Sequence, residues 1–194
     1  RATEVNPPRR KAMGLPADFS LRSLYEALDA QRGARGLSWA QATREMKGQS
    51  KARPFSPAAG PAAVSHALST STVQGTRMRA VAEGDGVLQM LRWLNRTPES
   101  FVPGHPQAES VSARLPVVPA GRVLRFDTKR IFAALDLQRR ERKMTWMQVA
   151  TEAGVGVSSL RHLSQGGRTA FPQVMRILRW LGRPAARFTR VSPH

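Results

Sequence analysis

The segment that decides the fold reads MTWMQVATEAGVGVSSLRHLSQG and covers residues 144–166. Thr145 and Gln148 stand three residues apart, which is the spacing of a capping box, so a helix is expected to begin here. Gly154 suits the left-handed residue that ends many helices. A second helix is expected to start near Ser158. The segment therefore predicts two short helices joined by a tight turn.

Amphipathic helices are predicted on both sides of this segment. Asp127 is a candidate N-cap for the preceding helix. The apolar positions of the three surrounding patterns recur at helical spacing: Ile131, Phe132 and Leu135 before the segment, Val149, Ala150 and Ala153 inside it, and Val174, Ile177, Leu178 and Leu181 after it.

The same pattern occurs earlier in the chain. LYEALDAQR at 24–32 matches IFAALDLQR at 131–139, and LSWAQATRE at 37–45 matches MTWMQVATE at 144–152, both at an offset of 107. LRWLNR at 91–96 matches LRWLGR at 178–183 at an offset of 87. Such a long period is not that of a solenoid. It predicts two copies of one small domain, the first with 20 extra residues between Glu45 and Leu91.

Domain boundaries follow from the repeat and from composition. Residues 1–17 are expected to be a flexible basic arm, 18–102 the first domain with an insert near 47–66, 103–124 a Pro-rich linker, and 125–191 the second domain. In the first domain Ser20, Ser38 and Gln41 take the capping positions, and Val87, Met90, Leu91 and Leu94 form the final stripe. No strand-type alternation is recognised. The predicted fold class is therefore all-α, with two tandem helical domains.

Charge is the strongest property of the composition. The 194 residues hold 31 Lys and Arg against 13 Asp and Glu, a formal net charge of +18. This favours a polyanionic partner, nucleic acid ahead of a membrane surface; a merely basic protein from a high-GC genome is the alternative. The chain has no cysteine, which fits the cytoplasm. No catalytic arrangement, metal-ligand spacing or phosphate loop is recognised, so no enzyme activity, metal or cofactor is expected.

Residues 144–166 resemble the helix-turn-helix of the phage-repressor (Cro/Xre-type) family. The residues that carry the resemblance are Gln148, Val149, Ala150, Ala153, Gly154, Val155, Ser158, Leu160, Leu163 and Gly166. The resemblance implies that the second helix of the motif enters the major groove of DNA. The alternative is that these are two short packed helices of an ordinary helical domain.

The resemblance also assigns DNA contacts in the second domain. Thr145 and Trp146 are expected near the phosphate backbone at a helix N-terminus. Base edges are expected to be contacted by Val157, Ser158, Ser159 and His162, either bases or phosphates by Arg161 and Gln165, and phosphate by Arg168. Ser158 could equally be a helix N-cap only.

The first domain departs from the family pattern. Lys47 occupies the turn-glycine position, and the insert follows. Ser38 and Trp39 correspond to Thr145 and Trp146. The candidate readers are Thr70, Ser71, Thr72, Gln74 and Gly75, with Arg77 and Arg79 beside them and Lys51 and Arg53 in the insert as backbone contacts. The insert either makes a second contact with DNA or has no effect on DNA binding.

These expectations combine into a sequence-specific binder of double-stranded DNA, a transcriptional regulator that reads an asymmetric two-part site. Two alternatives remain open. One is a largely non-specific nucleoid-type DNA binder carried by charge. The other is a regulator in which the first domain contacts a protein partner.

Overall fold

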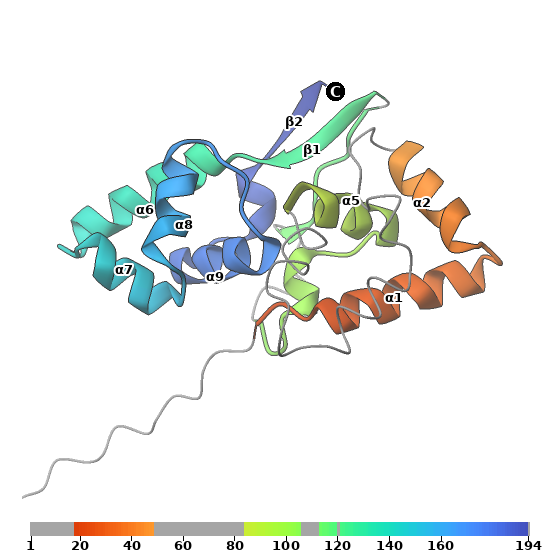
Figure 1. The fold of residues 1–194 in the computed structure, drawn as a ribbon, viewed down its shortest axis with the longest axis horizontal. Helices are drawn as coiled ribbons and strands as arrows, with labels where there is room; N and C mark the ends of the chain where they lie inside the picture. The colour runs from red at the N-terminus through yellow and green to blue at the C-terminus, as the bar shows by residue number, and fades with distance from the viewer. Residues whose placement is uncertain (1–17, 49–83, 106–112, 120, 194) are drawn as a thin grey trace, which may run out of the picture.

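The computed structural model describes residues 18–48, 84–105, 113–119 and 121–193. Residues 18–105, the first half, contain α1 (Leu21–Ala34), α2 (Trp39–Gly48), α5 (Gly84–Leu94) and the 3-10 helix η1 (Pro98–Phe101). Residues 121–193, the second half, contain β1 (Arg122–Phe126), α6 (Thr128–Glu141), α7 (Trp146–Ala153), α8 (Val157–Ser164), α9 (Phe171–Leu181), the 3-10 helix η3 (Ala185–Phe188) and β2 (Thr189–Pro193). The protein is mostly helical (Figure 1).

The predicted helix caps are confirmed. The Ser20 side chain accepts a hydrogen bond from the backbone N–H of Ser23 at 3.1 Å. Thr145 and Gln148 form the reciprocal capping box that opens α7. Gly154 ends α7 in the left-handed conformation, with φ +68°. Because these bonds satisfy backbone groups that a helix end leaves unpaired, they fix where the helices begin and end.

Each half contains the same set of tertiary contacts. The Trp93 indole donates to Glu45 at 2.9 Å. The equivalent indole of Trp180 donates to Glu152 at 2.9 Å, and this bond, with the salt bridge to Arg142, holds the pKa of that carboxyl below its usual range. Further equivalent pairs are the stacked rings Tyr25–Trp39 and Phe132–Trp146, and the Gln31–Trp93 and Gln138–Trp180 hydrogen bonds.

Contacts between the halves are reciprocal. α5 packs on α9, its own equivalent in the repeat. Phe19 of the first half lies against Phe171 with ring centroids 4.7 Å apart. Phe126, the equivalent of Phe19, lies against Gly84, the equivalent of Phe171. An interface in which residue i meets j and the copy of j meets the copy of i is that of a two-fold dimer. The halves are therefore related by a local pseudo-two-fold axis.

Polar contacts follow the same reciprocity. Arg176 on α9 pairs with Asp18, just before α1. Gln89, its equivalent on α5, donates to the carbonyl of Leu124, just before α6, at 3.0 Å. Figure 1 shows the result: α1 and α2 occupy one end of the molecule, α6 and α7 the other in the opposite sense, and α5 and α9 lie between them. One repeated unit thus packs against itself within a single chain.

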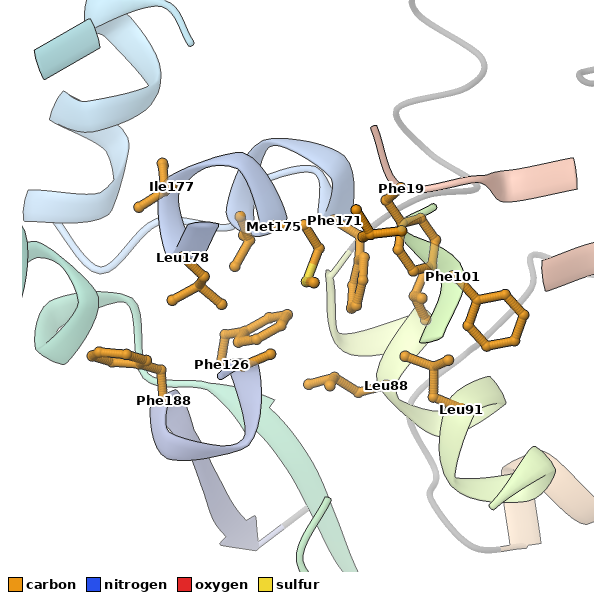
Figure 2. Close-up of a cluster of buried hydrophobic side chains, with 14 of the residues drawn as sticks. Phe19, Leu88, Leu91, Phe101, Phe126, Phe171, Met175, Ile177, Leu178 and Phe188 are labelled. Atoms are coloured by element: carbon orange, nitrogen blue, oxygen red, sulfur yellow. The ribbon is translucent and has the colours of Figure 1, made fainter. Parts of the chain in front are cut away.

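Both halves contribute to one hydrophobic core. The buried cluster includes Leu28 and Leu91 from the first half and Leu135 and Leu178 from the second. Figure 2 shows its centre, where Phe171 and Met175 of α9 face Leu88 of α5. All four predicted residues of the final stripe in each half are buried. The two copies are therefore not separate cores joined by a linker.

The predicted absence of strands was wrong for one small element. β1 and β2 form an antiparallel two-stranded sheet, in which Leu124 pairs with Val191. β1 begins at Arg122, inside the predicted linker 103–124, and Ala113, Val118, Val123 and Leu124 of that range are buried. β1 reads RVLRF and its neighbouring residues Val123 and Leu124 are both buried, so it lacks the alternation that would indicate a strand. The linker is therefore partly core.

Candidate nucleic-acid interface

The turn at Gly154 joins α7 to α8. It is fixed by its own backbone hydrogen bonds and by contacts with α9. After Gly154, the backbone N–H of Val155 donates to the carbonyl of Ala150 at 3.0 Å. The Arg176 guanidinium donates to the Gly154 carbonyl at 2.9 Å. Buried Leu160 and Leu163 hold α8 against the core. The turn is therefore fixed to α9 as well as by its own backbone.

Arg176 also links this turn to the first half. Its Nε donates to Asp18 Oδ1 at 2.7 Å. This bond holds the pKa of Asp18 below its usual range and raises that of Arg176. One side chain thus joins the turn between α7 and α8, α9 and the start of the first half.

The solvent face of α8 is polar and basic. Of the predicted contact residues of the second domain, the side chains of Ser158, Arg161, His162, Gln165 and Arg168 are exposed. The structure brings them together on α8 and the loop after it. This is the face that the sequence assigned to DNA.

Two residues predicted to contact bases are half-buried and also make contacts within the protein. The hydroxyl of Ser159 is hydrogen-bonded to Gln173 on α9 at 2.9 Å. Val157 is half-buried against the hydrophobic core. The N-cap of α8 is Gly156, so the alternative prediction that Ser158 caps this helix is wrong. A helix of eight residues gives about two turns, and which positions face outward depends on where it starts.

The side chains at the start of α7 make contacts within the protein. Thr145 is exposed, but its hydroxyl accepts the capping bond from Gln148 at 3.2 Å. The Trp146 ring stacks on Phe132 with centroids 4.9 Å apart, and the Arg139 guanidinium lies over it at 4.8 Å. The backbone N–H groups of this helix start are suited to a phosphate, and the hydroxyl hydrogen of exposed Thr145 is not used by the capping bond.

The first half repeats this arrangement where it is described. Ser38 and Gln41 exchange the capping bonds of α2 at 2.7 and 3.2 Å, and the Trp39 ring stacks on Tyr25. α2 continues through Lys47 to Gly48, whereas α7 ends before Gly154 at the equivalent point. The predicted contacts Lys51, Arg53, Thr70, Ser71, Thr72, Gln74, Gly75, Arg77 and Arg79 lie outside the described residues, as do most of the insert 47–66 and the arm 1–17.

Several basic residues near α8 were not predicted. The Lys129 side chain on α6 passes beside Gly166, where an added Cβ would lie 3.2 Å from its Cε. Arg125 and Arg190 line the same pocket as Arg168. They lie outside the segment 144–166 that resembles a known motif. The packing of α6 on α8 places Lys129 here, and the pairing of β1 with β2 places Arg190 beside Arg125. No sequence signal had indicated that pairing.

Other kinds of site find no support in the described residues. Within these ranges there is no group of three or more His, Asp or Glu that could hold a metal ion. No helix described here combines the length and apolarity needed to cross a membrane. Comparison with protein-family models, curated proteins and solved structures finds no match to this chain.

Proposed function

We propose that the protein binds double-stranded DNA and reads base sequence with the exposed face of α8. The observation that carries the proposal is the combination of a fixed helix-turn-helix unit with Ser158, Arg161, His162 and Gln165 on its free side. A helix presented in this way fits the major groove, where an arginine can donate two hydrogen bonds to guanine. The net charge of +18 supports a polyanionic partner.

The pseudo-two-fold arrangement adds a constraint on the DNA site. Because α2 and α7 are equivalent and the halves are related by a two-fold axis, the two ends of the molecule would meet a duplex in opposite directions. The two copies differ in sequence, so the half-sites would differ as well. We infer a two-part site with inverted polarity and unequal halves, bound by a regulator of transcription.

The test is selection of bound sequences from a random duplex pool with the whole chain. Wild-type protein should enrich a motif, with its site bound roughly 10³-fold or more above random DNA. Arg161→Ala should change the preferred base at one position, at a cost of about 1–3 kcal/mol. Arg187→Ala, which removes an exposed arginine on η3, is the matched control and should leave the motif unchanged.

The other outcomes identify the alternatives. Binding that is tight but enriches no sequence would indicate a non-specific organiser of DNA. Affinity that does not fall with rising salt would exclude DNA as the partner, since each phosphate contact contributes about 0.9 to the salt slope. If the selected motif is identical for Arg161→Ala and wild type, α8 does not read bases through this residue.

A further inference from the structure

A small pocket lies at the seam between the two halves. Its volume is about 120 Å³, while one water molecule needs roughly 10–15 Å³ of such space. Pockets for drug-sized ligands begin near 300 Å³. The pocket therefore has room for a small polar group such as phosphate.

The starts of two helices contribute to the wall of this pocket. Gly84 is the first residue of α5 and Thr128 the first of α6, and both line it. Thr169, which also lines it, stands just before α9, whose N-cap Ala170 makes no side-chain capping bond. The N-terminus of a helix presents N–H groups and partial positive charge, which favour an anion.

Three arginines line the pocket, namely Arg125, Arg168 and Arg190, against one acid, Asp85. Asp85 forms a salt bridge with Arg125 at 3.3 Å. Arg125 and Arg190 are directly opposite each other in the antiparallel pairing of β1 and β2. Like charges at opposite positions of neighbouring strands are destabilising. Among the described residues that line the pocket, arginines outnumber carboxylates, and this composition favours an oxyanion.

The pocket also contains an unused hydrogen-bond donor. Thr169 is 9% exposed, and its hydroxyl oxygen is buried with no hydrogen-bond partner among the described residues. Leaving a buried hydroxyl unpaired is costly, and native structures rarely do so without a reason. Because Thr169 lines the pocket, a rotation of its side chain toward a ligand oxygen there would give this enclosed hydroxyl a partner.

We propose that this pocket is a binding site for a phosphate group. This proposal rests on the proposed function, because the occupant is a phosphate of the DNA backbone. Arg168, just beyond α8, would contact it together with Arg125 and Arg190. Free inorganic phosphate has the same chemistry and is the other source. The site would join both halves to one anion, because Gly84 and Asp85 belong to the first half and the arginines to the second.

Two variants test the site because each is expected to leave the fold intact. Thr169→Val removes the unpaired hydroxyl at nearly constant shape, and Arg190→Gln removes one of two facing charges. Both should be at least as stable as wild type in chloride, since each removes an unfavourable feature. Thr189→Val is the matched control outside the pocket, because the hydroxyl of Thr189 already donates to the carbonyl of Ala186 at 2.8 Å.

The first measurement is binding of inorganic phosphate by the whole chain, by calorimetry and by the rise in melting temperature, against chloride at equal ionic strength. Phosphate should stabilise wild type and Thr189→Val. Its affinity should fall roughly two- to tenfold in Thr169→Val and tenfold or more in Arg190→Gln. Equal binding of phosphate to wild type and both pocket variants would overturn the site.

The second measurement is affinity for a DNA duplex, which separates the two sources. If a backbone phosphate occupies the pocket, Thr169→Val and Arg190→Gln weaken duplex binding, and added phosphate competes at constant ionic strength. If the two variants weaken phosphate binding but leave duplex binding unchanged, the site holds free phosphate. Phosphate binding without any duplex binding would reject the proposed function and retain this site. Duplex binding that both variants leave unchanged, with no phosphate binding, would reject the site alone.

Discussion

Glu99 is a buried carboxylate between the two halves. It is 1% exposed, and its Oε1 accepts a hydrogen bond from the backbone N–H of Ala185 at 2.6 Å. Its Oε2 has no partner among the described residues. Burial raises the pKa of Glu99 above the usual range, although the hydrogen bond from Ala185 acts in the opposite direction. The folded protein therefore holds this proton more tightly than the unfolded chain does.

The raised pKa predicts a specific dependence of stability on pH. Between the ordinary pKa of a glutamate and the raised value, the folded state binds more protons, so stability from this group falls as pH rises. Glu99→Gln keeps the acceptor for Ala185 and should remove that fall, which denaturant unfolding at several pH values measures. Glu26→Gln, at an exposed site on α1, is the control. If Glu99→Gln had the same dependence of stability on pH as wild type, the raised pKa of Glu99 would be contradicted.

Gly154 sets the angle between α7 and α8 through its backbone conformation. Its φ is +68°, and an added Cβ would meet only Arg176 Cδ at 4.0 Å. Gly154→Ala should therefore cost about 1–2 kcal/mol, from left-handed strain rather than from a clash. Gly33→Ala, in α1 where an added Cβ meets nothing within 4 Å, should be neutral or stabilise by up to about 1 kcal/mol. Chemical denaturation compares the two, and equal effects would remove the conformational argument.

At the scale of elements, sequence predicted helices better than it predicted the sheet. The capping residues Ser20, Asp127 and Thr145 announce helix starts locally, because a cap is a bond between near neighbours. The stripes on α5 and α9 extend over about two turns and show the helical period. β1 shows nothing comparable, because its five residues are defined by pairing with β2, more than 60 positions later.

The candidate site was predictable to the same degree. The exposed residues Ser158, Arg161 and His162 follow from the motif. The inward turn of Ser159 depends on Gln173 of α9, which is a tertiary contact. The pocket proposed to bind phosphate depends on β1, β2 and α5 meeting at the seam. The sequence therefore indicates the helix that presents the site, but not the residues of α5, α9, β1 and β2 that surround it.

A pair of alanine substitutions measures how far the predicted linker belongs to the core. Leu124 is 0% exposed and Val117 is 95% exposed, and both lie in the range 103–124. Leu124→Ala should lower the free energy of unfolding by about 2–5 kcal/mol, while Val117→Ala should change it by less than about 0.5 kcal/mol. Thermal or denaturant unfolding reports both. Equal small effects of the two substitutions would mean that β1 is a linker and does not contribute to the core.

At the scale of the whole molecule, the shared core predicts one unfolding transition. Trp93 reports on the first half and Trp180 on the second. In a variant that keeps only one of these two tryptophans and has Trp39 and Trp146 replaced, the fluorescence transition should coincide with the loss of helical circular dichroism in the same variant, since a two-state protein gives coincident transitions with different probes. Phe171→Ala removes a fully buried side chain at the seam and should shift both transitions together, by about 3–5 kcal/mol. Separate midpoints would show that the halves fold independently.

The reciprocal seam between α5 and α9 also determines how the protein responds to its own abundance. Two separate chains pair only when both are plentiful, so the active form rises with the square of their concentration at low levels. Here the partner half is always attached, at a fixed effective concentration. The amount of paired units therefore rises in direct proportion to synthesis and survives dilution. Because a substitution in one half is not copied into the other, each half can also change without its counterpart.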